Sequence, residues 1–435
     1  MSADEDRVNI VEYWRGVELL SPQSLDRVDE DDERVSRVEV GGPLPWEAGH
    51  GLRELWLGDK QAWRHLVFLG VFSLDRAFGD VRRAYPSDEG MLDEWPRAGE
   101  SALAAFVVAD DGRAVLGSPV LASCAWAIGQ ALREGPASVG SASFERVSSS
   151  FRSEWEEEVA AAADDERARE LEREGWFVGR ELGGDDLGAC LELASRLLEL
   201  DRLPEDAELR RALEIRVVSR TVAAREAHAA GSRELLNSFY AEDLRKVGRA
   251  VTQGACGRAL CEYLTPASRI DVEARVDVER DLTRVRKSLS PHRIPLGRWP
   301  SPTAHVPSLG QQLGLNEILG DSSRGVWAVN GPPGTGKTVM LRDLLAALVV
   351  ERAKKMVELD PSEAFEEPLP WRGRRVHPPV AALCGYEIVL ACATNAAAEN
   401  VSAEIPAVDA IDSCWLGACD YFPEVATQML TPPGC

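Results

Sequence analysis

Short apolar runs bounded by charged residues mark the first 135 residues of this 435-residue chain. Such runs are typical of buried strands, and two of them, Ser101–Val108 and Ala114–Leu116, are separated by Asp110-Asp111-Gly112. Asp-Gly between apolar runs predicts a β-hairpin in which both turn residues have positive φ. We therefore predict a mixed α/β domain over residues 1–135. Its other predicted features are a strand at Trp63–Leu74, a helix at Leu121–Arg133, and a core containing Trp14, Trp46, Trp56, Trp63 and Trp126.

Helical composition follows from residue 136 to residue 290, where Ala, Glu, Arg and Leu dominate and apolar residues recur at helical spacing. The predicted helical segments are 154–174, 187–200, 205–230 and 235–264. Residues 291–307 contain five prolines and no helical period, so they are predicted to be a linker. Strand and helix patterns alternate after it, which is typical of a parallel α/β domain over residues 308–435.

A glycine-rich loop carries the clearest chemical signal in the chain. The apolar run Val326–Val329 predicts a buried strand, and Val339–Val350 predicts an amphipathic helix. Between them the sequence fits G-x-x-x-x-G-K-[ST] at every fixed position, in the strand–loop–helix context that this motif requires. Its residues are Gly331, Pro332, Pro333, Gly334, Thr335, Gly336, Lys337 and Thr338.

Each residue type in this loop suits the binding of a nucleoside triphosphate, which we expect to be ATP. Glycines let the backbone turn its N–H groups toward phosphate oxygens, and the following helix adds the positive end of its dipole. Lys337 can reach the β- and γ-phosphates, and the hydroxyl of Thr338 can ligate Mg²⁺. We therefore expect Lys337 and Thr338 to be the catalytic residues of the loop, with ATP and Mg²⁺ as cofactors.

Two flanking segments indicate which kind of P-loop protein this is. The segment Leu309–Asn316 (LGQQLGLN) resembles the Q motif of superfamily 1 helicases, with Gln311 followed at the expected spacing by Gly314-Leu315. A glutamine amide offers both a donor and an acceptor to the edge of adenine, so Gln311 is the candidate base-binding residue. Gln312 is the neighbouring glutamine and misses the motif spacing by one residue. The alternative for Gln311 is a surface glutamine that binds no ligand.

The second flanking segment, Glu387–Val401 (EIVLACATNAAAENV), resembles motif Ia of superfamily 1 helicases. In that family this motif contacts the nucleic-acid backbone. Thr394 and Asn395 would stand at the carboxyl end of a strand, where open α/β sheets bind their ligands, and their polar groups suit phosphate or sugar. Capping of the next helix by either residue is the alternative, and capping and binding are compatible.

The wider sequence resembles large bacterial superfamily 1 helicase-like ATPases. The motif resemblance covers residues 309–405, and further segments resemble those proteins: FYAEDL (239–244), GRWPS (297–301), WAVNGPPGTGKTVMLRDLLA (327–346) and DYFPEVA (420–426). The resemblance implies a RecA-like domain that couples ATP hydrolysis to movement along single-stranded DNA or RNA. The fold class we predict is therefore α/β, an incomplete RecA-like P-loop domain preceded by a mixed α/β domain and a helical region.

Two parts that the resemblance requires do not appear in the sequence. The family uses an Asp-Glu pair on a third strand to hold Mg²⁺, and arginines from a second RecA-like domain. Asp412, Asp420 and Glu424 do not stand in such a context. We therefore expect the RecA-like domain to be truncated after motif Ia. The chain would then be a truncated gene product, a subunit completed by a second polypeptide that carries the remaining motifs, or a fragment of a longer protein. The alternatives are a catalytically inactive nucleotide-sensing scaffold and an AAA+ type ATPase.

Composition narrows the expected partners and location. The net charge of −23 opposes broad nucleic-acid affinity, so we expect only weak binding of single strands. The nine cysteines form no C-x-x-C pair, which favours free thiols over a zinc site. The charged first ten residues do not resemble a signal peptide, and no apolar run reaches the length of a membrane helix. We expect a cytoplasmic protein without a membrane partner.

Overall fold

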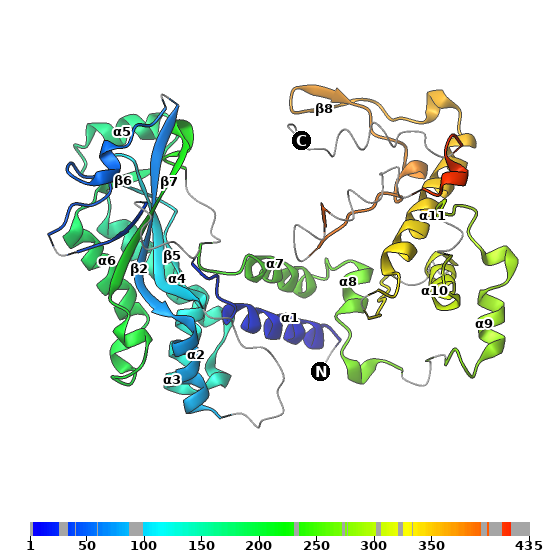
Figure 1. Cartoon of the computed structure of the whole chain (residues 1–435), viewed down its shortest axis with the longest axis horizontal. Helices are drawn as coiled ribbons and strands as arrows, with labels where there is room; N and C mark the ends of the chain where they lie inside the picture. The colour runs from blue at the N-terminus through cyan, green and yellow to red at the C-terminus, as the bar shows by residue number, and fades with distance from the viewer. Residues whose placement is uncertain are drawn as a thin grey trace. The chain divides into compact units, whose positions relative to one another are not determined.

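The computed structural model describes most of the chain in two compact units. The described residues are 3–25, 34–39, 41–58, 60–86, 99–229, 235–271, 275, 277–301, 306–320, 325–332, 334–392, 398–399 and 411–418. The first unit is Met1–Cys256 with Leu264–Pro266, and the second is Gly257–Tyr263 with Ala267–Cys435 (Figure 1). Together they form a mixed α/β protein.

A seven-stranded sheet forms the centre of the described part of the first unit. Its strand order is β1-β7-β2-β3-β4-β6, with β5 paired to β3, and every one of these pairings is antiparallel. The strands are β1 (Val35–Arg37), β2 (Gln61–Ser73), β3 (Glu100–Ala109), β4 (Arg113–Val115), β5 (Val120–Leu121), β6 (Val178–Glu181) and β7 (Glu214–Ala223). The predicted strand at Trp63–Leu74 is confirmed as β2.

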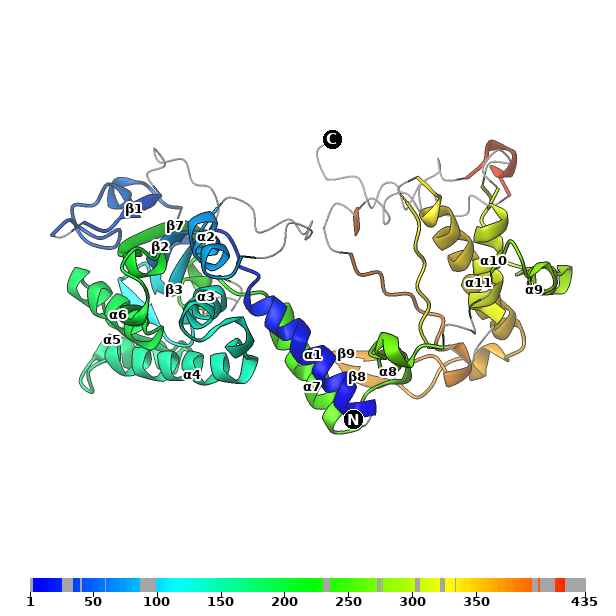
Figure 2. The same ribbon diagram turned by 90° about the horizontal axis from the view of Figure 1, so that it is seen from below.

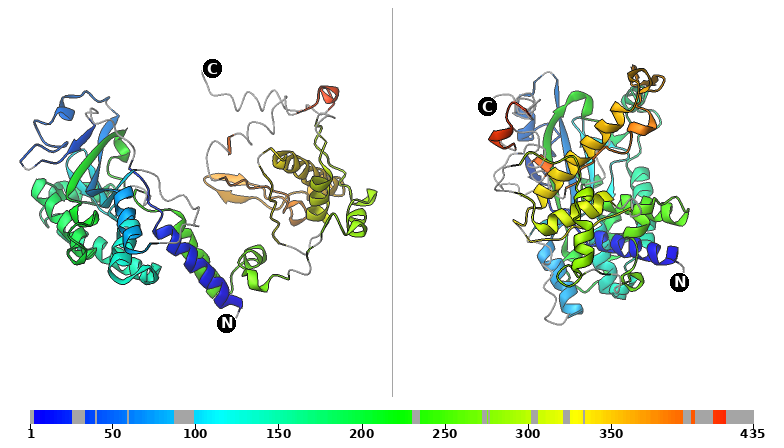
Figure 3. Two further views of the ribbon diagram at one scale, coloured as in Figure 1. Left: turned by 60° about the horizontal axis from the view of Figure 1, so that its bottom comes forward. Right: turned by 90° about the vertical axis from the view of Figure 1, so that its right-hand side faces the viewer.

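Helices cover the sheet and extend from it. In Figure 2, α3, α4 and α6 lie on the same side of the strands, and Figures 2 and 3 show α1 and α7 side by side. The helices of this unit are α1 (Ala3–Leu19), α2 (Leu74–Ala84), α3 (Ser123–Glu134), α4 (Ser141–Glu158), α5 (Glu166–Arg173), α6 (Gly184–Leu197) and α7 (Tyr240–Thr252). Helix α3 confirms the prediction at Leu121–Arg133.

Aromatic side chains fill the core between the sheet and α4. Phe106 on β3 and Trp155 on α4 are fully buried, with ring centroids 5.0 Å apart. Of the tryptophans predicted to fill the core, Trp46, Trp63 and Trp126 are buried, Trp14 is partly buried, and Trp56 is 87% exposed. The prediction for Trp56 was wrong because apolar character alone does not say which side of a loop faces the core.

The predicted hairpin is confirmed as β3 and β4, but its turn differs from the prediction. Ala109 O accepts a hydrogen bond from Gly112 N (2.9 Å), and only Gly112 of the turn has positive φ, at +80°. This is the three-residue turn that ends in a left-handed glycine. A Cβ on residue 112 would lie 2.6 Å from Cδ1 of Trp46, so glycine is required both for its φ and for its size.

The region predicted to be mainly helical contributes two strands to this same sheet. Residues 214–223 form β7, which pairs with β1 on one edge and β2 on the other. The helix predicted over 205–230 was wrong because pairing with two neighbouring strands overrides a helical composition. Strand β6 also lies inside residues 136–290, so the compact unit does not end at residue 135.

The second unit is built around two packed helices. Helix α10 (Leu309–Gly320) packs against α11 (Lys337–Val357). The unit also contains α8 (Arg258–Tyr263), α9 (Leu282–Ser288), a hairpin of β8 (Leu369–Trp371) and β9 (Arg374–Val376), and short 3-10 helices. No helix in the described part of the chain is both long and apolar enough to cross a membrane.

The segment predicted to be a linker packs on α11 instead. Residue 297 must be glycine there, because an added Cβ would lie 2.3 Å from Ala346 O. Trp299 N donates a hydrogen bond of 2.8 Å to the carboxylate of Asp343 in α11. The described residues of 291–307 are therefore part of the second unit.

The two strands predicted in the second unit are extended segments without strand partners among the described residues. Residues 326–330 and 386–392 are in neither helix nor strand, and Val389 is 93% exposed. A parallel strand becomes buried only when neighbours pair with it and helices cover both faces. The large sheet of the described structure is antiparallel and belongs to the first unit, so it provides no parallel neighbours for these two segments.

His65 is a buried titratable group at the centre of the first sheet. Its Nδ1 lies 2.8 Å from Oγ of Ser219 on β7, and its ring lies 5.3 Å from that of Trp46. Burial, aided by the charges of Arg53 and His50, lowers the pKa of His65 to about 3. The imidazole is therefore neutral in the folded protein at neutral pH.

We predict that the first unit loses stability as pH falls through the window between 6.5 and about 3. The folded pKa lies below the unfolded value, so unfolded His65 gains a proton that the folded protein excludes. The resulting loss is about 2 kcal/mol between pH of about 7.5 and about 5. Urea unfolding followed by circular dichroism at both pH values should show this loss. His65→Gln should remove most of it, and the remainder comes from His50, whose pKa burial also lowers.

The control is His292→Gln, which removes an exposed imidazole from the second unit. It should keep the pH dependence of the unchanged protein. If His65→Gln kept that dependence in full, another group would be responsible.

Candidate functional site

The glycine-rich loop runs directly into the amino terminus of α11. Gly334 and Gly336 have φ of +80° and +74°, the left-handed region in which other residues are strained. Gly336 is also the N-cap of α11, and no side chain caps this end of the helix. These backbone conformations curl the loop around the start of a 21-residue helix whose dipole attracts anions. Pro333 lies outside the described residues.

Lys337 is the cation of this loop and lies against it. Its Nζ donates hydrogen bonds to Gly331 O (2.6 Å) and Pro332 O (2.9 Å). Thr335 Oγ1 donates to the same Pro332 carbonyl at 2.8 Å, which closes the turn. The ammonium group is therefore held at the loop, where it can exchange carbonyl oxygens for phosphate oxygens. Thr338, the second residue of α11, is exposed.

Gln311 lies at this loop, with both ends of its amide engaged. Its Nε2 donates to Thr335 O (2.6 Å) and Gly336 O (3.2 Å), and its Oε1 accepts from Ser308 N (2.7 Å). These bonds join α10 to the loop backbone. The structure thus places Gln311 beside the predicted phosphate site, in a position that supports the loop.

Gln312 belongs to a polar chain that leads away from the loop. It accepts a 2.8 Å hydrogen bond from Arg298 and donates one of 2.7 Å to Asn316, whose amide donates to Ser288 O at 2.8 Å. Asn316 is fully buried. Gln312 therefore fixes the position of α10, whereas Gln311 contacts the glycine-rich loop.

Arg298 and Asp343 support the site, and neither was predicted. Arg298 donates to both carboxylate oxygens of Asp343, at 3.2 Å each, and Asp343 is only 3% exposed. A paired carboxylate inside an apolar helix face is the signal that could have revealed them. The pair connects the 297–301 segment to α11. Arg298 also donates a hydrogen bond to Gln312, so the same arginine links this segment to α10.

The start of the segment that leads into the loop is fixed by α8. Glu262 accepts a hydrogen bond of 2.8 Å from Gly325 N. This bond, with a smaller effect of Arg258, lowers the pKa of Glu262 below its usual range. An added Cβ on residue 325 would lie 2.9 Å from Cα of Ala259, so the two segments are in close contact.

The predicted nucleic-acid residues, Thr394 and Asn395, lie outside the described residues. Nearby, Glu387 forms an ion pair of 3.7 Å with Arg352 of α11, which holds the start of their segment beside that helix. Asp412 caps a short turn by accepting from Cys414 N at 2.8 Å. Within the described part of the chain, no group of three or more His, Cys, Asp and Glu side chains could hold a metal ion.

Comparisons with known proteins add no family to these observations. The chain matches no protein-family model, no curated protein and no solved structure. The assignment of a function therefore depends on the residues and geometry of the site itself.

Proposed function

We propose that the loop Gly331–Thr338 binds the phosphates of ATP and that this chain is the ATP-binding portion of a superfamily 1-type helicase. The observation that carries the proposal is the loop itself: two left-handed glycines, a lysine held at the loop and an uncapped helix amino terminus. These groups are donors or positive charges, so their arrangement suits a polyanion. The flanking Q-motif-like and motif Ia-like sequences favour a helicase over other P-loop classes.

The bound state follows from the contacts at the loop. The ammonium of Lys337 exchanges the carbonyls of Gly331 and Pro332 for oxygens of the β- and γ-phosphates. Backbone N–H groups at the start of α11 face the same anion. Thr338 is exposed, and its hydroxyl would hold Mg²⁺. The ion would neutralise the negative charge of the phosphates. Gln311 keeps the loop in its curled form through Thr335 and Gly336.

The finer fold in this proposal is a RecA-like domain. We propose that 326–329 and 387–392 become neighbouring parallel strands once further strands pair with them, on a second polypeptide or beyond the described residues. Their apolar side chains support this, because Val329 is 52% and Val389 93% exposed. Burying such surface is favourable by about 25 cal/mol per Å². In that sheet Thr394 and Asn395 would face single-stranded DNA or RNA.

Lys337→Ala should weaken ATP binding by about 1.5–3 kcal/mol, the value of a charge-assisted contact. Isothermal titration in the presence of Mg²⁺ measures the affinity. Lys354→Ala, which removes an exposed lysine from the same helix, is the matched control and should bind ATP normally. Equal affinities of Lys337→Ala and the control would contradict the proposed phosphate site.

Gln311→Ala should weaken ATP and GTP binding by similar factors, because Gln311 supports the loop that holds the phosphates. Competition of the two nucleotides measures base preference separately from affinity. Gln312→Ala is the comparison, since its contacts lead to Arg298 and Asn316 rather than to the loop. A selective loss of ATP binding in Gln311→Ala would instead mean that this glutamine recognises adenine.

ATP turnover by this chain should remain near background even when ATP is bound. Phosphoryl transfer needs a positioned water and neutralised charge, and an arginine finger alone contributes on the order of 10³–10⁵ in rate. The sequence supplies neither that arginine nor the Asp-Glu pair. A phosphate-release assay tests this with and without single-stranded nucleic acid. Rapid turnover that Lys337→Ala abolishes would show that another acid, such as Asp412 or Asp420, completes the site.

A further inference from the structure

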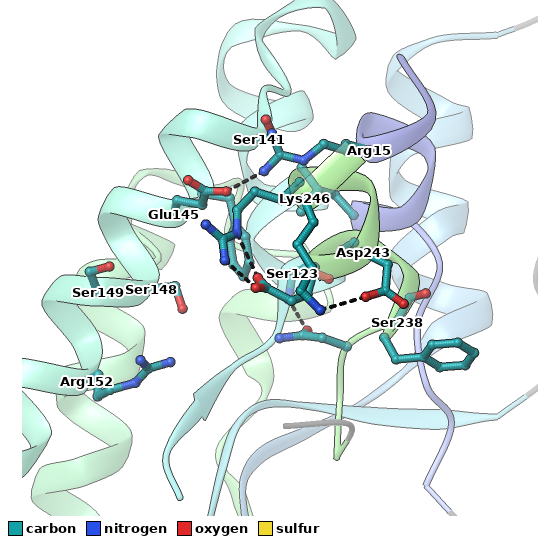
Figure 4. A pocket seen from close by; sticks show the side chains of 17 residues that line it. Arg15, Ser123, Ser141, Glu145, Ser148, Ser149, Arg152, Ser238, Asp243 and Lys246 are labelled. Atoms are coloured by element: carbon teal, nitrogen blue, oxygen red, sulfur yellow. Dashed lines mark hydrogen bonds and ion pairs between the residues drawn. The ribbon is translucent and has the colours of Figure 1, made fainter. Parts of the chain in front are cut away.

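A pocket of about 640 Å³ lies within the first unit. The glycine-rich loop belongs to the second unit, so the two sites are separate. Its walls are α1, α4 and α7, with the amino-terminal residue of α3 between them (Figure 4). Helix α4 presents Ser141, Glu145, Ser148, Ser149 and Arg152 to it. Their spacing places all five on one face of the helix. The pocket is therefore lined by a continuous polar strip.

Among the residues that the structure describes, one cation of this pocket has no acidic partner. Each of its three acidic residues forms an ion pair with a basic residue that also lines it: Arg15–Glu145, Arg245–Glu242 and Lys246–Asp243. Arg152 is the fourth basic residue, and among the described residues it has no ion pair or hydrogen bond. In a chain with a net charge of −23, the pocket thus has a surplus positive charge.

Three buried polar atoms at the pocket have no hydrogen-bond partner among the described residues. They are Nε of Arg15, Nε of Arg152 and Oγ of Ser123, whose residue is only 2% exposed. A buried donor without an acceptor costs about 1–3 kcal/mol, and a ligand or an ordered water in the pocket can supply the acceptor. The two Nε groups can only donate. Their common requirement is an acceptor that carries negative charge.

We propose that this pocket binds a phosphate group, held by the guanidinium group of Arg152, the unpaired cation of the pocket among the described residues, and by the hydroxyl of Ser123. Ser148 and Ser149 add two hydroxyls on the face of α4 that carries Arg152. Phosphate suits this set better than a carboxylate because its oxygens accept from donors in several directions at once. The cavity is larger than inorganic phosphate, so the group belongs to a small phosphomonoester rather than to free phosphate.

Titration calorimetry on the full chain tests the proposal, with Lys337→Ala present so that the glycine-rich loop does not contribute. The probes are inorganic phosphate, glycerol 3-phosphate and glycerol. Glycerol 3-phosphate should bind at least as tightly as phosphate, and glycerol should not bind. Adding Arg152→Gln should weaken glycerol 3-phosphate binding roughly ten- to hundred-fold, the range for a charge-assisted contact. Ser123→Ala should weaken it by a smaller factor.

The matched control is Arg146→Gln, which removes an arginine of α4 that does not line the pocket and contacts Ser143. It should leave binding unchanged, and circular dichroism should show that all variants are folded. Equal binding by Arg152→Gln and Arg146→Gln would overturn the assignment, as would the absence of saturable binding of both phosphate probes. Binding of phosphate without glycerol 3-phosphate would overturn the phosphomonoester assignment. None of these outcomes depends on the function of the loop.

Discussion

Strand β2 is hydrogen-bonded along both edges, to β3 on one side and to β7 on the other, and the first unit depends on this double pairing. The hairpin that follows β3 forms locally, whereas β7 reaches β2 from far along the chain. Pairing with β7 buries the centre of β2, including His65, which lies against Ser219 of β7. The helices then have a completed sheet to pack on, and α3, which starts at Ser123, brings that residue to the pocket wall.

The second unit is held together more by polar contacts than by an apolar core. Its described buried apolar side chains are few: Val285, Leu315, Met340, Ala347 and Leu383. The carboxylate of Asp343 instead fixes the 297–301 segment on α11 through Arg298 and Trp299 N. Removing Arg298 would leave the carboxylate of Asp343, whose side chain is only 4% exposed, without its charged partner. This network sets the packing of α10 on α11 and hence the contact of Gln311 with the loop.

Both proposed anion sites of this acidic protein rest on local hydrogen-bond donors and not on its net charge. The net charge of −23 repels polyanions at long range, but salt screens that repulsion over about 8–10 Å. Within contact distance, Lys337 and the start of α11 face the phosphate site proposed at the loop, and Arg152 lines the pocket proposed for a phosphomonoester. The acids around the second site are already paired with cations. Both proposals therefore concern binding by a local set of donors and not general affinity for nucleic acid.

The sequence by itself determined the features whose signals are local. The glycine-rich loop, the β3–β4 hairpin, strand β2 and helix α3 all follow from short-range requirements on φ, periodicity and apolar runs. The tertiary structure alone decided that 214–223 is a strand, because a strand exists only where distant neighbours pair with it. For the same reason 326–329, although apolar, is no strand here. The sequence did not reveal side-chain partners either. The amide of Gln311 contacts the loop, and Arg152 has no partner in the described part of the chain, because helices distant in sequence pack together.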